Sequence, residues 1–141
     1  MKLTKIFFAL LMIFAVTQAT AKDPKEPKTP KTKDAIIPVY SVGVATSFND
    51  TVAYITDIQV LDDTILDHKA YLHRRSGYSF QLRDYLQAQG KQDYTCLILF
   101  HPKKAKLEKQ LSKVKLRFAK DNIQVIEINE QDFRFTKPEE L

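Results

Sequence analysis

Basic side chains dominate the stretch from Lys103 to Lys120, where Glu108 is the only acidic residue. If this stretch is helical, five of them fall within about 80° of one another; they are Lys106, Lys109, Lys113, Arg117 and Lys120. Clustered cations of this kind bind anionic lipid head groups or anionic polysaccharides. A plain solvated helix face is the commoner role of a charge run, so both interpretations stay open.

A second basic group stands directly before another predicted helix. The sequence His73-Arg74-Arg75-Ser76-Gly77 places two guanidinium groups beside helix N-terminal amides. Such amides attract phosphate and carboxylate groups, and arginine pairs with both. Arg74 and Arg75 therefore join the candidate anion-binding residues, although Ser76 and Gly77 also suit a simple helix cap.

Carboxylate and imidazole groups suggest one catalytic alternative. Asp57 and the stretch from His68 to Arg75 contain the residue types that a small hydrolase of the cell envelope uses for proton transfer. Asp62, Asp63 and Asp67 add carboxylates nearby, but they lack the glycine-centred loop of a typical calcium site. We expect a non-catalytic module without metal or cofactor, and the hydrolase is the alternative.

The N-terminal residues have the pattern of a secretory signal peptide. Lys2 and Lys5 precede an apolar run from Ile6 to Val16, and small residues end at Ala21. The run is too short for a spanning helix, which needs about 20 residues. We therefore expect cleavage after Ala21 and a periplasmic or secreted chain with no transmembrane segment.

A repeat of Lys and Pro follows the predicted cleavage site, reading KDPKEPKTPKTK. Its period matches the turn of a polyproline II helix, and no apolar side chain large enough for a core lies between Ala21 and Ala35. Residues 22–34 are therefore predicted to be a semi-rigid linker. One α+β domain is expected at residues 35–137, with a frayed tail at 138–141.

The domain has alternating and helical hydrophobic patterns in a definite order. Alternation predicts a hairpin of two strands around Asn49-Asp50. Further patterns predict two helices, two central strands and a short edge strand; the strands are residues 38–48, 51–61, 94–100, 123–128 and 133–135, and the helices are residues 78–90 and 103–120. The order ββαβαβ predicts a two-layer sandwich with a mixed sheet and a C-terminal βαβ unit.

Two details of these elements bear on function. Leu107, Leu111, Val114 and Phe118 form an apolar stripe on the last helix, which predicts that the basic residues face away from the core. The lone Cys96 lies in an apolar strand and is expected to be an inert, buried thiol.

Several short motifs resemble a group of small exported bacterial proteins that have no known activity. The resemblance rests on Tyr40-Ser41-Val42-Gly43-Val44, Phe48-Asn49-Asp50, Thr56-Asp57-Ile58-Gln59 and Tyr78-Ser79-Phe80-Gln81-Leu82-Arg83. It covers most of the domain and implies an α+β fold. The expected partner is an anionic envelope component. Nucleic acid is not expected, because no aromatic residue interleaves with the five basic residues of the last predicted helix to stack on bases.

Overall fold

The computed structural model describes residues 35–62, 64–66 and 71–139. The predicted signal peptide and linker lie outside these residues, as do Asp63, Asp67, His68 and the last two residues of the predicted tail.

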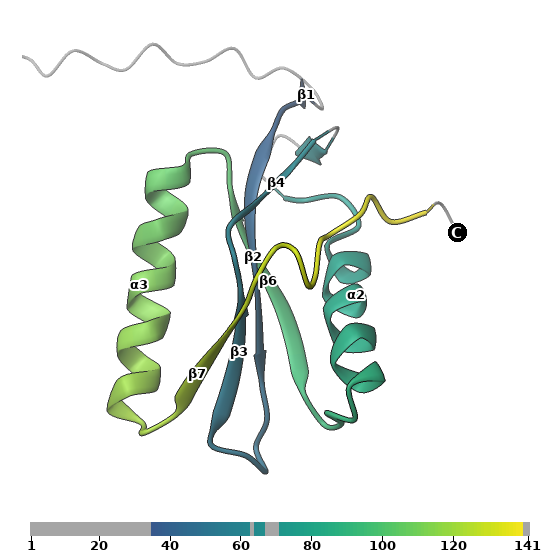
Figure 1. Ribbon diagram of the computed structural model, residues 1–141. Helices are drawn as coiled ribbons and strands as arrows, with labels where there is room; N and C mark the ends of the chain where they lie inside the picture. Colours follow the sequence, from purple (N-terminus) through teal and green to yellow (C-terminus); the bar gives the residue numbers. More distant parts are fainter. Residues whose placement is uncertain (1–34, 63, 67–70, 140–141) are drawn as a thin grey trace, which may run out of the picture. The chain divides into compact units, whose positions relative to one another are not determined.

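A mixed sheet forms the middle of the domain (Figure 1). Strand β2 pairs antiparallel with β6 along one edge, and with β3 and then β4 along the other. Strand β7 pairs parallel with β3, which gives the spatial order β6, β2, β3/β4, β7. The bounds are Val39–Thr46 (β2), Val52–Thr56 (β3), Gln59–Leu61 (β4), Thr95–His101 (β6) and Gln124–Ile128 (β7). Two short strands, β1 (Ala35–Ile36) and β5 (Ile65–Leu66), pair separately.

The two helices cover opposite faces of this sheet (Figure 1). Helix α3 (Lys104–Lys120) packs Leu107 and Phe118 against Val42 and Val44 of β2. Helix α2 (Arg75–Ala88) packs its buried side chains against the alternate residues of the same strand. The α+β class is therefore confirmed, but the domain has three layers where two were predicted.

Small residues in β2 explain the additional layer. Gly43 stands on the α2 face, where an added Cβ would lie 2.7 Å from Cδ2 of Leu82 and 3.0 Å from Cζ of Phe135. Ser41 and Ala45 share this face and are fully buried. Small side chains do not stand out as a hydrophobic stripe, so the sequence pattern does not show that a helix covers them.

Two strands predicted to be central are edges of the sheet. Among the described residues, β6 pairs only with β2, and β7 pairs only with β3. Both β6 and β7 run parallel to β3, and α3 joins them, so the βαβ connection is present with β2 and β3 between its strands. Apolar runs predict burial between flanking strands, but only Ile98 of β6 and Ile128 of β7 are buried. Helices α2 and α3 pack on β6, and α3 packs on β7.

One extra residue interrupts the strand that follows the hairpin. Val44 pairs with Ile55 in β3, whereas Ser41 pairs with Gln59 in β4, so the register shifts by one residue between them. This is the signature of a β-bulge, which bends a strand and redirects its side chains. Asp57 lies in the bulge, and its amide donates to the carbonyl of Ile128 at 3.0 Å.

The C-terminal segment after β7 is held by a buried glutamine. Gln59 donates through Nε2 to the Phe133 carbonyl at 2.9 Å and accepts through Oε1 from the Phe135 amide at 2.8 Å. Its side-chain amide thus replaces a neighbouring strand, and the segment is not the edge strand predicted at residues 133–135. Gln81 of α2 bonds both backbone groups of Thr136 in the same way, at 2.8 and 2.9 Å.

The aromatic rings of this segment complete the α2 layer. Phe133 and Phe135 are 8% and 7% exposed. Their rings contact Tyr85 and Tyr78 of α2, with centroids 5.0 and 5.9 Å apart. Arg74 donates through Nη1 to the carbonyl of Pro138 at 2.7 Å, further along the same segment.

Replacing leucine by alanine at two positions of α3 tests its orientation. Leu107→Ala should lower the free energy of unfolding by about 2 to 5 kcal/mol, because it leaves a cavity between helix and sheet. Leu116 is 63% exposed, so Leu116→Ala should change it by less than about 0.5 kcal/mol. Urea denaturation measures both, and equal losses would show that the helix is rotated from the described position.

Replacing each glutamine by leucine tests the attachment of the C-terminal segment. Gln59→Leu should cost about 2 to 4 kcal/mol, because the Phe133 carbonyl and the Phe135 amide would be left buried without partners. Gln81→Leu should cost less than about 1 kcal/mol, since its bonds are exposed and water can replace them. Urea denaturation of the pair decides it, and similar small losses would contradict a structural role for Gln59.

Candidate functional site

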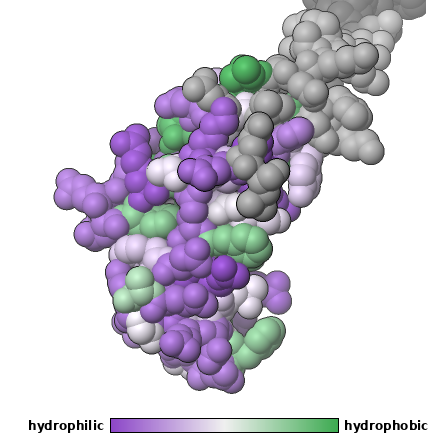
Figure 2. Space-filling view, turned by 90° about the vertical axis from the view of Figure 1, so that its right-hand side faces the viewer, coloured by the Kyte–Doolittle hydropathy of each residue, from purple (hydrophilic) through white to green (hydrophobic). Residues whose placement is uncertain are grey.

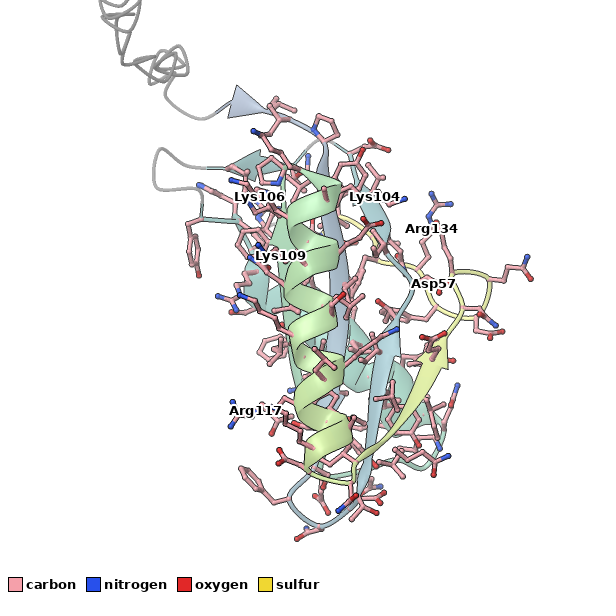
Figure 3. The ribbon with its side chains drawn as sticks, turned by 90° about the vertical axis from the view of Figure 1, so that its left-hand side faces the viewer. Asp57, Lys104, Lys106, Lys109, Arg117 and Arg134 are labelled. Atoms are coloured by element: carbon pink, nitrogen blue, oxygen red, sulfur yellow. The ribbon has the colours of Figure 1, made fainter. Side chains whose placement is uncertain are left out.

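The predicted basic residues lie on the outer side of α3. Leu107 and Phe118 face the sheet, with Leu111 and Val114 partly buried beside them, so the predicted apolar stripe is confirmed. The five basic residues are all exposed. Figure 3 shows Lys106, Lys109 and Arg117 along one side of the helix, away from Asp57 and Arg134.

Most of these five basic residues have no carboxylate partner among the described residues. The acidic side chains near α3 pair mainly with other residues, in contacts of Lys104 with Glu108 at 4.0 Å and of Lys115 with Glu127 at 2.6 Å. The hydrogen bond from Lys115 is the main reason that the pKa of Glu127 is lowered. Arg117 lies 4.0 Å from Asp121. In the described part of the chain, no carboxylate forms a salt bridge with Lys106, Lys109, Lys113 or Lys120.

The two arginines at the start of α2 point to different neighbours. Arg74 has left-handed backbone geometry with φ 56°, and its guanidinium bonds the C-terminal segment at Pro138. The guanidinium carbon of Arg75 lies 5.7 Å from the ring centroid of Phe100 in β6. The structure therefore does not bring this pair together around one anion at the helix N-terminus.

Asp57 lies where β3 and β7 end side by side. Its Oδ2 accepts a hydrogen bond from the Glu130 amide at 3.0 Å, which ties the bulge to the turn after β7. An open cavity of about 630 Å³ adjoins it, lined by Asp57, Asn129, Glu130, Gln131 and Arg134. A second of about 410 Å³ shares Asp57 and Glu130 and extends to Lys104 and Lys115 of α3.

The hydrolase alternative needs Asp57 to meet the stretch from His68 to Arg75. Neither cavity at Asp57 is lined by Arg74 or Arg75, and His68 lies outside the described residues. Within residues 35–62, 64–66 and 71–139, no group of three or more His, Cys, Asp and Glu side chains is placed to hold a metal ion. Arg74 and Arg75 therefore do not share either of these cavities with Asp57.

Cys96 is only half-buried, on the α2 face of β6. Burial raises the pKa of its thiol to about 11, against a smaller opposing effect of the nearby Arg83 guanidinium. The thiol is therefore protonated at neutral pH, and the thiolate is the reactive form.

Comparison with known proteins gives no relative on which to model a function. The chain matches no protein-family model, no curated protein and no solved structure. Among the described residues, no helix is both long enough and apolar enough to cross a membrane. Within the described part of the chain, the candidate sites are the basic residues on α3, the cavities at Asp57 and the sheet edges at β6 and β7.

The pKa of Cys96 predicts slow, strongly pH-dependent alkylation. Iodoacetamide should modify the folded protein roughly ten- to a hundredfold more slowly at pH 7.5 than it modifies an unstructured cysteine peptide. Because the pKa is raised, the rate should keep rising with pH up to about 11. Mass spectrometry of timed samples measures it, and a plateau near pH 8.5 would show an ordinary exposed thiol.

Proposed function

We propose that this chain is a non-catalytic, exported module of the cell envelope that binds an anionic partner through α3. The binding face consists of Lys106, Lys109, Lys113, Arg117 and Lys120, and is called the basic face below. Export follows from the N-terminal sequence pattern and is part of the proposal. The observation that carries the binding role is the exposure of five like charges with little local compensation.

The spacing of the basic face suits a partner with many charges. Lys106 and Lys120 are about 20 Å apart along the helix, at 1.5 Å per residue. Several anionic groups can therefore be contacted at once. Near an anionic membrane each Lys or Arg contributes about 1 kcal/mol, so five together support modest, reversible binding where one alone does not.

The inner side of α3 also supports this role. Leu107 and Phe118 fix the helix to the sheet, so the charges sit on a rigid support. Like charges on one helix face repel one another, which costs stability in the free protein. A bound anionic surface would relieve that repulsion.

Vesicle binding tests the proposal directly. Protein purified after export should bind vesicles containing anionic lipid and should not bind neutral vesicles, as measured by co-sedimentation. Binding should fade with added salt, because the Debye length falls from about 10 Å at 0.1 M to about 3 Å at 1 M. The double variant Lys109→Glu/Lys113→Glu should lose binding.

A control matched in charge separates the basic face from net charge. The double variant Arg134→Glu/Lys137→Glu changes the net charge equally, at positions outside α3 and away from β6, and should keep most of the binding. If both double variants lost vesicle binding equally, the binding would depend on the net charge of the protein and not on the basic face. Absence of binding by the unmodified protein would leave α3 as a solvated helix, while turnover of an envelope substrate would favour the hydrolase.

A further inference from the structure

Strand β6 is a long apolar edge of the sheet. Its seven residues, TCLILFH, pair with β2 without a bulge from Thr95 to His101. They include no Lys, Arg, Asp, Glu or Pro, which are residues that commonly protect edge strands. The opposite edge, β7, carries Glu127 in a salt bridge with Lys115. Among the described residues, no backbone hydrogen bond other than those with β2 involves β6.

The direction of the outward backbone groups follows from β2. The Gly43 amide donates to Oγ1 of Thr56 in β3 at 2.8 Å, so the odd-numbered residues of β2 point toward β3. The even-numbered residues then point toward β6, where Val42 pairs with Leu99 and Val44 with Leu97. Alternation along β6 leaves the amides and carbonyls of Cys96, Ile98 and Phe100 directed away from the sheet.

Two arginines of α2 lie beside the ends of the row formed by Cys96, Ile98 and Phe100. Arg75 stacks over Phe100, with its guanidinium carbon 5.7 Å from the ring centroid. Arg83 lies near Cys96, and its guanidinium carbon is 4.6 Å from the ring centroid of Phe80. It also pairs with the exposed carboxylate of Asp84 at 3.0 Å, so a peptide carboxylate would share or replace that contact. The side of α2 that faces the C-terminal segment carries Gln81 instead. The guanidinium groups thus stand on the β6 side of the helix.

Helix α3 places positive charge on the other side of the same edge. Lys104, Glu108 and Lys115 line the cavity beside β7. At 100° per residue, Lys106 and Arg117 fall on the opposite flank of the helix, which is the β6 side. Figure 3 shows them there, while β7, Asp57 and Arg134 lie on the far side of α3. The view onto α2 in Figure 2 is mainly hydrophilic, with hydrophobic patches that are separate and small.

We propose that the free edge of β6 binds an extended acidic peptide, which adds to the sheet as a further strand. The amides and carbonyls of Cys96, Ile98 and Phe100 would form its backbone hydrogen bonds. Carboxylates of the peptide would face Arg75 and Arg83 on one side and Lys106 and Arg117 on the other. The inferred partner is therefore an acidic, unfolded segment of another protein, a class that the basic face alone does not specify.

Charge favours this occupant over a second copy of the chain. Antiparallel pairing of two β6 strands about Ile98 would set Phe100 opposite Cys96 of the second copy. Arg75 would then meet Arg83 of that copy, and each chain is net positive, at +5 for the full sequence and +3 once the predicted signal peptide with Lys2 and Lys5 is removed. A lipid surface offers no row of backbone groups to pair with the edge. An acidic peptide satisfies both the hydrogen bonds and the charges.

A labelled peptide of alternating Glu and Val is the probe. Fluorescence anisotropy should show that it binds the purified protein, and that matched peptides of alternating Lys and Val, or with methylated backbone amides, do not. Arg75→Glu/Arg83→Glu should weaken binding about tenfold. The equally charged Arg134→Glu/Lys137→Glu, placed away from β6, should change it by less than about twofold.

Amide chemical shifts locate the bound peptide without any substitution. The amide resonances of Ile98 and Phe100 should move most on titration, and those of Leu97 and Leu99 should move less because their protons already bond to β2. The proposal is overturned if no binding occurs, if the Lys–Val peptide binds equally, or if only α3 resonances move. The proposal would also be overturned, in favour of a second copy of the chain, if the protein dimerised without peptide and the Ile98 amide resonance moved on dimerisation. This readout uses neither vesicles nor the Lys109 and Lys113 variants. Peptide binding at β6 can therefore be disproved while vesicle binding through α3 stands, and vesicle binding can be disproved while peptide binding stands.

Discussion

The buried amide of Gln59 is the interaction on which the rest of the domain depends. It bonds the backbone on both sides of Arg134, at Phe133 and Phe135, and so holds a segment that pairs with no strand among the described residues. Without it, the two phenylalanines would lose their attachment to the sheet and expose the side chains of α2 that they cover. Because both amide atoms are used, the glutamine is satisfied although it is only 2% exposed.

This attachment also decides which surfaces remain open to partners. The C-terminal segment occupies the side of α2 that carries Gln81 and Tyr85, so Arg75 and Arg83 are left on the β6 side. The α3 layer is closed by its own apolar stripe, which leaves its charges outward. The two proposed partner surfaces, the basic face and the edge of β6, are therefore adjacent, since the charged flank of α3 lies beside the same edge (Figure 3).

The helices, hairpin and basic face could be predicted from the sequence because each rests on local periodicity. The phase of α3 follows from Leu107 and Phe118, and the structure agrees with it. The third layer could not be predicted, since Gly43, Ser41 and Ala45 accept a helix by being small and not by being strongly apolar. Gln59 gave no signal either, because a polar residue in a strand is read as exposed. The interruption of the apolar alternation at Asp57 was a visible trace of the bulge, but only the register of β3 and β4 identifies it.

The C-terminal segment is fixed within the domain, whereas the outer edge of β6 bonds to no other backbone in the described part of the chain. Amide hydrogen exchange of the unliganded protein, followed residue by residue by NMR, tests both parts in one measurement. The Phe135 amide should exchange at least about a hundredfold more slowly than the Ile98 amide, whose proton points away from the sheet. A Phe135 amide that exchanges as fast as Ile98, or an Ile98 amide as protected as its neighbour Leu99, would contradict the account.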